Sequence, residues 1–266
     1  MKASEKHRLD RYDVKAVGLR PLAEQHVTMD NALARAGHGL TLSEKRIVMA
    51  AVSKLDSRRQ YTTSPLKTRI TAAEYAETFG VDIDTAYDQL ESAATHLYHR
   101  SITFFEHAAA HRRRTRRRGE DDKLITVRMR WVGSIRYQKG EGWVELSWWH
   151  ELIPHLVGIQ KQFTSYQLKQ ASALRSAYSW KLLELLMRWE STGCAEYTID
   201  ELHMSMETPP SLRRDFALLR QRVIEPAVRE LCEKDGWEIS WQPLKKGRKV
   251  AAILFNFRRN PQGSLF

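Results

Sequence analysis

A threonine–x–x–glutamate tetrapeptide opens two amphipathic segments of the chain, at Thr71–Glu74 and again at Thr198–Glu201. At this spacing the threonine side chain can accept a hydrogen bond from the glutamate amide while the glutamate side chain reaches back, so each tetrapeptide predicts a helix start. A short turn, a second amphipathic helix and a β segment follow in both copies, which run over residues 71 to about 106 and 198 to about 257. The duplication predicts an α+β fold of two tandem winged-helix domains.

The chain length agrees with two domains. It has 266 residues, whereas a typical domain has about 100 to 200. The expected divisions are an N-terminal arm over residues 1–28, a first winged-helix domain over 29–157, a second over 158–259 and a C-terminal tail over 260–266. The arm is expected to be loose because its residues show no sustained hydrophobic period.

The charge favours a polyanionic partner. Lysine and arginine outnumber aspartate and glutamate by 43 to 32, which gives a net charge of +11 and a pI near 9.7. Nucleic acid and an anionic membrane surface would both satisfy this excess. No apolar run approaches the roughly 20 residues that span a bilayer, and the start of the chain is charged where a signal peptide would be apolar. We therefore expect a cytoplasmic protein that is not membrane-bound.

The sequence offers little for a metal or a cofactor. Only Cys194 and Cys232 are present, so neither a disulfide framework nor a four-cysteine zinc site is available. His107 and His111 have the i, i+4 spacing of helical ligands, but no cysteine or acidic helix accompanies them, and a solvated loop is the preferred interpretation. We predict no metal and no cofactor.

In the first module, residues 71–79 are expected to form a short helix that ends at Gly80, with Asp82 or Asp84 capping the next helix. A similar threonine start, Thr41, precedes a core-facing helix upstream. The helix after Asp82 should bury an apolar stripe of Tyr87, Leu90, Ala94, Leu97 and Tyr98. Its outer face is polar, and four residues there are candidate base readers: Thr85, Asp88, Gln89 and Ser92.

The second module carries a more basic version of the same pattern. Ser211 is expected to cap its second helix, and Pro226 to kink or interrupt that helix. Two alternating segments follow, 237–241 and 253–257, and their connection should form a wing against phosphate. The candidate DNA-binding residues around the helix are Arg213, Arg214, Arg220, the neutral Gln221 and Arg222. Those in the wing are Lys245, Lys246, Arg248 and Lys249.

Arginine at the start of a recognition helix is the side chain that most often reads guanine in the major groove. Arg213, Arg214 and Arg220 are therefore the preferred base readers, with Gln221 and Arg222 ranked below them. The separate run Arg112–Arg118 lies between two expected strands and is interpreted as a loop with nonspecific phosphate contact. The modules thus differ: the second should carry the main DNA readout, and the first auxiliary DNA contact and dimerisation.

Five segments of the chain together resemble plasmid replication initiator proteins of the iteron-binding Rep type. They are L-T-L-S-E-K-R from Leu40, W-V-G-S-I-R-Y-Q-K-G-E-G from Trp131, S-A-Y-S-W-K-L-L-E-L-L from Ser176, R-V-I-E-P-A-V from Arg222 and K-K-G-R-K-V from Lys245. The resemblance covers residues 28 to about 258. It implies two winged-helix domains that bind double-stranded DNA at the direct repeats of a plasmid origin and help to open the neighbouring DNA.

The resemblance also implies partners. Members of this family bind origin repeats as monomers and an inverted repeat in their own operator as dimers, with the first domain forming the dimer contact. A homodimer in equilibrium with monomer is therefore expected, together with contacts to a host initiator and the replicative helicase, and repression of the chain's own promoter. The family is not enzymatic.

Two rival functions remain open. A nicking enzyme would need a tyrosine nucleophile beside paired metal-binding histidines, but no H-x-H occurs and Tyr166 and Tyr178 lie in helical patterns. The chain also lacks the G-x-x-x-x-G-K-[ST] loop of an ATP-driven helicase. The second rival is a dedicated winged-helix transcriptional repressor, which would bind inverted repeats and no tandem direct repeats.

Overall fold

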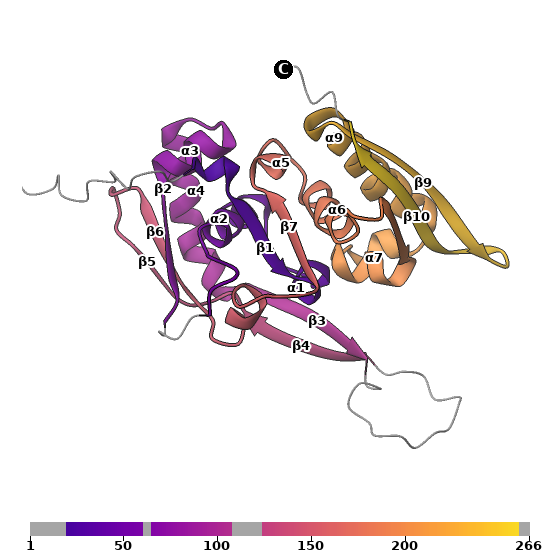
Figure 1. Cartoon of the computed structure of the whole chain (residues 1–266), viewed down its shortest axis with the longest axis horizontal. Helices are drawn as coiled ribbons and strands as arrows, with labels where there is room; N and C mark the ends of the chain where they lie inside the picture. The colour runs from indigo at the N-terminus through magenta and orange to yellow at the C-terminus, as the bar shows by residue number, and fades with distance from the viewer. Residues whose placement is uncertain (1–19, 61–64, 108–123, 261–266) are drawn as a thin grey trace, which may run out of the picture.

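The computed structural model describes residues 20–60, 65–107 and 124–260 (Figure 1). The first module contains a helix, a strand, a helix–turn–helix and two further strands, in this order along the chain. Its three strands form one sheet in the order β2–β6–β5. These elements are α2 (Leu42–Ser53), β2 (Lys67–Thr71), α3 (Ala72–Phe79), α4 (Ile83–His96), β5 (Val132–Tyr137) and β6 (Trp143–Trp148).

The second module repeats this order of elements. Its sheet has the order β8–β10–β9, in which the last strand again lies between the first and the second. Its elements are α6 (Ala177–Met187), β8 (Cys194–Thr198), α7 (Ile199–Ser205), α8 (Phe216–Leu219), a π turn (Arg220–Ile224), α9 (Glu225–Asp235), β9 (Trp237–Lys246) and β10 (Lys249–Arg259). Each module is therefore a helix–turn–helix with a β-hairpin wing.

The threonine starts act as the sequence predicts. At Thr71 and at Thr198 the side chain accepts a hydrogen bond from the amide of the glutamate three residues later. The carboxylate of that glutamate accepts a hydrogen bond from the threonine amide. A third such capping box begins α2 at Thr41. Both repeated boxes lie at the same place in their modules, where the first strand of the sheet turns into the first helix of the helix–turn–helix.

One small sheet was not expected. β1 (His26–Asp30) pairs antiparallel with β7 (Phe163–Gln167). The prediction that residues 1–28 form a loose arm is therefore wrong for residues 26–28, and the assignment of Tyr166 to a helical pattern is also wrong. The physical reason is that both segments bury every second residue, as strands do.

The predicted domain bounds stay predictions, although the pairing of β7 with β1 places residues 163–167 beside the first module. The short helices α1 (Asn31–Arg35) and α5 (Lys169–Ser172) flank the two strands. Short 3-10 turns complete the chain at Leu22–Glu24, Leu97–His99, Ile153–His155 and Pro210–Arg213.

An inserted hairpin interrupts the first module between α4 and β5. It consists of β3 (Ser101–His107) and β4 (Leu124–Arg130) and extends from the body in the same direction as the β9–β10 hairpin (Figure 1). The run Arg112–Arg118 and His111 lie outside the described residues.

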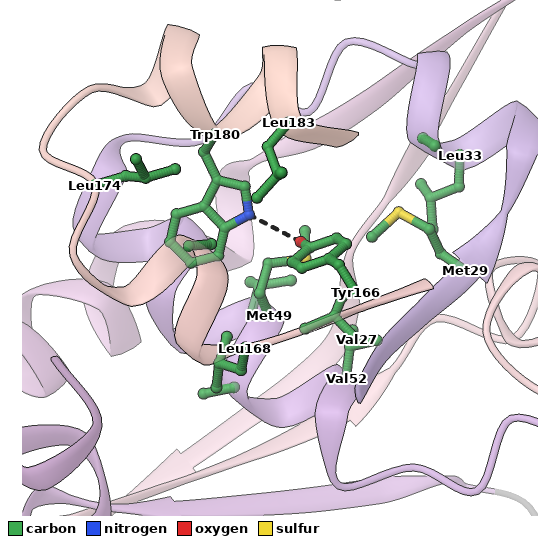
Figure 2. Packing of buried hydrophobic residues seen from close by; sticks show 14 of the residues in the cluster. Val27, Met29, Leu33, Met49, Val52, Tyr166, Leu168, Leu174, Trp180 and Leu183 are labelled. Atoms are coloured by element: carbon green, nitrogen blue, oxygen red, sulfur yellow. Dashed lines mark hydrogen bonds between the residues drawn. The ribbon is translucent and has the colours of Figure 1, made fainter. Parts of the chain in front are cut away.

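A shared hydrophobic core joins the two modules. Trp180 and Leu183 of α6 pack among residues of α2, β1 and β7, and the Trp180 indole donates a 2.8 Å hydrogen bond to the Tyr166 hydroxyl (Figure 2). Helix α6 is buried along almost its whole length. It is the first helix of the second module and at the same time a core element of the first.

Candidate nucleic-acid interface

The second helix of the second module begins later than the sequence indicates. Asp215 caps it by accepting from the Ala217 amide at 3.1 Å, whereas Ser211, the expected cap, lies within the preceding 3-10 turn. Two prolines, Pro209 and Pro210, precede this turn and favour its extended entry rather than a continuous helix. Arg213 and Arg214 therefore lie just before the helix and not inside it.

The arginines around this helix start differ in whether their side chains are bound within the protein. The Arg213 Nε donates to the Thr208 carbonyl at 2.8 Å, and the Arg220 Nε lies 3.4 Å from the Glu225 carboxylate. Arg214 and Arg222 are exposed and make no side-chain hydrogen bond or ion pair with other described residues, and the same holds for Gln221. Arg214 and Arg222 are thus the arginines whose guanidinium groups are free to meet a ligand.

A π turn lies in the middle of the helix. The Glu225 amide donates to the Arg220 carbonyl, five residues back, and Pro226 follows with no amide hydrogen to donate. The irregularity predicted at Pro226 is present, centred one turn earlier. The turn buries Val223 and Ile224 in the core and leaves Arg222 exposed.

The wing has the form that the sequence predicts. Lys246 and Lys249 are directly paired across β9 and β10, so only Gly247 and Arg248 form the turn. Gly247 has a φ of +66°, which places it in the left-handed region that the first central residue of a tight hairpin turn often requires. The four basic side chains are exposed and lack an acidic partner among the described residues: Lys245, Lys246, Arg248 and Lys249.

The base of the wing packs on the start of the helix. Phe216, the first residue of α8, meets Trp241 of β9 with ring centroids 6.5 Å apart. This contact ties the basic hairpin to the segment that carries Arg214, so the two groups of positive charge belong to one rigid unit. A surface of this kind suits duplex nucleic acid, because the helix start can enter a groove while the hairpin contacts the phosphate backbone.

The candidate base readers of the first module are only partly available. Thr85 is occupied by the cap of α4, because its amide and its hydroxyl both donate to Asp82. Gln89 accepts a short hydrogen bond from the Tyr75 hydroxyl. The side chains of Asp88 and Ser92 are exposed and make no contact of this kind within the described part of the chain.

The outer face of α4 also differs from the prediction. Tyr87 and Tyr98 were expected in the buried stripe, but they are 38% and 37% exposed. Tyr87 lies against Gly142, where a Cβ atom would lie 2.5 Å from its ring, so a turn distant in sequence holds it outside the core. The buried row consists of Ala86, Leu90, Ala93, Ala94 and the following Leu97.

Three of the side chains that α4 exposes are carboxylates: Asp84, Asp88 and Glu91. Glu91 pairs with Lys139 at 3.6 Å, whereas Asp84 and Asp88 would repel phosphate where the second module attracts it. The first module instead carries exposed arginines on β4, at Arg128 and Arg130. The Arg130 guanidinium stacks on the Tyr98 ring at 4.7 Å. Sequence reasoning did not select these arginines as site residues, although their alternation with Val127 and Met129 was visible.

The described residues contain no group of three or more histidine, cysteine, aspartate or glutamate side chains placed to hold a metal ion. Tyr166 is buried, and burial followed by the Glu184 charge raises the pKa of its hydroxyl well above the usual value. Such a hydroxyl is a poor nucleophile. Within the described ranges, no helix is long and apolar enough to cross a membrane.

Comparison with known protein families gives two matches. Residues 26–187 match the family described as "Initiator Replication protein, WH1", and residues 198–257 match the family described as "Initiator Rep protein, WH2". The two matches follow each other along the chain and include both helix–turn–helix units. They confirm the predicted fold class of two tandem winged-helix domains.

A curated relative and a solved structure are also similar. The "Uncharacterized 27.6 kDa protein" of Escherichia coli is 23% identical over 217 residues, which cover 78% of this chain and 85% of the relative. The solved structure is titled "Crystal structure of Pi initiator protein in complex with iteron DNA". It matches with a TM-score of 0.72 at 20% identity, over 91% of this chain and 100% of that one. At this identity the likeness supports the fold.

Proposed function

Because the chain belongs to the family of initiator replication proteins with two winged-helix domains, we propose that it binds direct repeats of duplex DNA at a plasmid replication origin. The resemblance of five sequence segments to iteron-binding initiators supports this proposal. The similar Pi initiator protein was solved with iteron DNA, which is a ligand of the same class.

One observation carries the proposal: the second module joins two free arginines, one just before the recognition helix and one in its π turn, to a wing tip with four exposed cations. Arg214 and Arg222 would reach base edges in the major groove, where a bidentate arginine–guanine pair is worth about 1–3 kcal/mol of discrimination. Lys245, Lys246, Arg248 and Lys249 would lie along phosphates, which gives affinity without base choice.

The first module would have a different part in the same function. We propose that it supplies the dimer contact and auxiliary DNA contacts, with Asp88 and Ser92, the unoccupied members of its predicted set, at base edges rather than phosphates. As a monomer the chain would bind origin repeats and promote opening of the adjacent duplex. As a dimer it would bind an inverted repeat in its own operator, and contacts with a host initiator and the replicative helicase would complete initiation.

Footprinting of the full chain on the DNA that flanks its gene tests the proposal directly. We expect protection of several tandem direct repeats, together with separate protection of an inverted repeat near the promoter. Protection of an inverted repeat alone would instead identify a dedicated winged-helix repressor. A plasmid that carries the tandem repeats and the gene should replicate, and deletion of the repeats should abolish its replication.

We further propose that the chain acts without catalysis of its own. Supercoiled plasmid that carries the repeats should stay supercoiled when incubated with the protein and Mg²⁺. Conversion to nicked circles, with protein covalently attached to a DNA end, would contradict this proposal and indicate a relaxing enzyme.

A further inference from the structure

Glu207 occupies an unusual position between the two modules. It follows α7 in the turn of the second helix–turn–helix and contacts the loop after α1 of the first module. Helices α1 and α7 lie next to each other (Figure 1). Its carboxylate accepts a 2.7 Å hydrogen bond from the Gly39 amide, 168 residues earlier in the chain. Only Glu207 and Gln162 among the described non-glycine residues have a positive φ.

The backbone of Glu207 carries a cost that something must offset. Its φ is +50°, in a region where residues other than glycine are disfavoured. The Glu207 amide donates to the Met204 carbonyl at 3.3 Å and the Thr208 amide to the His203 carbonyl at 3.2 Å, so a Schellman turn at the end of α7 holds this conformation. The turn places the Glu207 side chain, whose carboxylate adds the bond to Gly39 of the first module.

The loop that receives Glu207 is built closely around it. A Cβ atom on Gly37 would lie 2.9 Å from the side chain of Glu207. Gly39 has a φ of +62°, and a Cβ atom there would lie 2.6 Å from the Ser101 carbonyl. Gly39 requires glycine because of its positive φ and the Ser101 backbone, whereas a side chain at Gly37 would displace the Glu207 side chain that packs on it. Residues 37–39 therefore form the receptor loop for Glu207.

Beneath this loop lies a buried cluster of charges at the junction of the modules. Glu184 of α6 accepts from Lys45 of α2 at 2.9 Å and lies 3.4 Å from Lys181. The Lys181 ammonium also donates to the carbonyls of Ala34 and Ala36 at 3.1 and 2.8 Å. Burial keeps the pKa of the neighbouring His38 well below its usual value, so this imidazole adds no charge at neutral pH.

The cluster holds two lysines against one buried carboxylate. Glu207 supplies further negative charge at its edge, and this charge favours the protonated form of both Lys45 and Lys181. A carboxylate of the second module thus helps to balance lysines that are buried at the joint. Hydrogen bonding and electrostatics favour the same placement of Glu207.

We propose that Glu207 is a positioning residue that fixes the angle between the two winged-helix domains, and thereby the spacing of the DNA segments that one chain can grip. Helix α6 packs in the cores of both modules and is the first point of attachment between them. The Glu207–Gly39 contact is a second point of attachment, which lies outside that helix. The consequence for DNA rests on the proposed function, whereas the consequence for the free chain does not.

The first experiment measures the free full-length chain. Spin labels at Ser134→Cys and Ser240→Cys, in a background with Cys194→Ser and Cys232→Ser, report the distance between the modules. We expect Glu207→Gly, which removes the contact and the strain together, to broaden the distance distribution about twofold. Gln162→Gly, which relieves the other positive φ, is the matched control and should leave the distribution unchanged. An unchanged distribution in Glu207→Gly would overturn the proposal.

The second experiment uses the repeat located by footprinting. Insertion of one base pair at its centre moves the two halves apart by about 3.4 Å and rotates them by about 34°. The parent chain should lose about tenfold in affinity on this duplex, and Glu207→Gly should lose little, because its modules can adjust. Glu207→Gln keeps an acceptor oxygen and should lie between the two. An equal loss in the parent chain and in Glu207→Gly would overturn the spacing role.

The two experiments separate the inference from the proposed function. If the distance distribution broadens in Glu207→Gly but the parent chain binds no repeat, the proposed function fails while the joint stands. A purely structural role for Glu207 would lower the melting temperature and weaken binding to every duplex by the same factor. That pattern, with the distribution unchanged, counts against the proposal.

Discussion

At the scale of single residues, the basic side chains of the second module divide into bound and free ones. The Arg213 Nε donates to the Thr208 carbonyl and Arg220 forms a half-exposed ion pair with Glu225 at 3.4 Å without a hydrogen bond from its Nε, while Arg214 and the wing lysines make no contact of either kind among the described residues. A bound arginine has already committed donors that a guanine would need. Base choice should therefore depend on Arg214 more than on Arg213.

Replacement of Arg214 by alanine tests this assignment. We expect Arg214→Ala to reduce the free-energy difference between specific and random DNA binding by about 1–3 kcal/mol and to relax base choice at one position. The folded structure should be unaffected because the side chain has no described partner. Competition binding with repeat and scrambled duplexes gives the ratio. An unchanged ratio would show that Arg214 contacts phosphate rather than a base.

Lys246 should behave differently because it lies at the wing tip, beyond the reach of a recognition helix. Lys246→Ala should weaken repeat and random DNA by the same factor and reduce the slope of log K against log salt by about one. Lys161, an exposed lysine of the first module, gives the control: Lys161→Ala should leave the slope unchanged. A change in the specific-to-random ratio in Lys246→Ala would contradict the assignment.

At the scale of elements, the parts that local rules determine were predictable and the parts that depend on distant neighbours were not. The capping boxes at Thr71 and Thr198 and the β9–β10 hairpin follow from short spacings in the sequence. The β1–β7 sheet joins segments 137 residues apart, and nothing local indicates the partner of either strand.

The candidate site shows the same division. The cationic wing tip follows from neighbouring residues, whereas the helix start does not, because Ser211 and Asp215 are both good caps and only packing chooses between them. The exposure of Tyr87 depends on Gly142, which belongs to a different element. The occupation of Gln89 by Tyr75 likewise requires the packing of α3 on α4.

The cap of α8 gives a prediction at this scale. Asp215→Ala should lower the free energy of unfolding by about 1 kcal/mol, because the Ala217 amide loses its acceptor. It should also weaken repeat binding, since Arg214 precedes this cap directly. Asp215→Asn keeps a capping oxygen and should retain most of the stability. Denaturant titration measures both variants, and an equal loss in the two would show that charge, not capping, is what Asp215 provides.

At the scale of the whole molecule, the two modules share a core that contains charges as well as apolar side chains. Lys45, Lys181 and Glu184 are almost completely buried at the junction. Buried ion pairs contribute little to net stability compared with apolar packing, but an arrangement that leaves one of their charges buried without its partner is strongly destabilised. A junction of this kind favours one arrangement of the modules over others and accords with the positioning role of Glu207.

The junction makes the stability of the whole chain depend on pH. Burial, together with the charge on Lys45, lowers the pKa of Lys181 to about 7 against the opposing effect of Glu184. The unfolded chain has an ordinary lysine with a pKa of about 10.4. Between pH 7 and pH 9 the unfolded chain therefore keeps a proton that the folded chain releases, and each rise in pH favours the folded state.

The size of this effect follows from the two pKa values. For Lys181 alone, the free energy of unfolding should rise by about 2 kcal/mol from pH 7 to pH 9. Lys181→Met removes the titrating group, so the rise in the parent chain should exceed the rise in the variant by that amount. Above pH 9 the buried tyrosines, including Tyr166 with its raised pKa, reverse the trend because the unfolded chain ionises them first. Urea titrations of the two proteins at pH 7, 8 and 9 supply the measurement, and parallel curves would mean that Lys181 stays protonated in the folded junction.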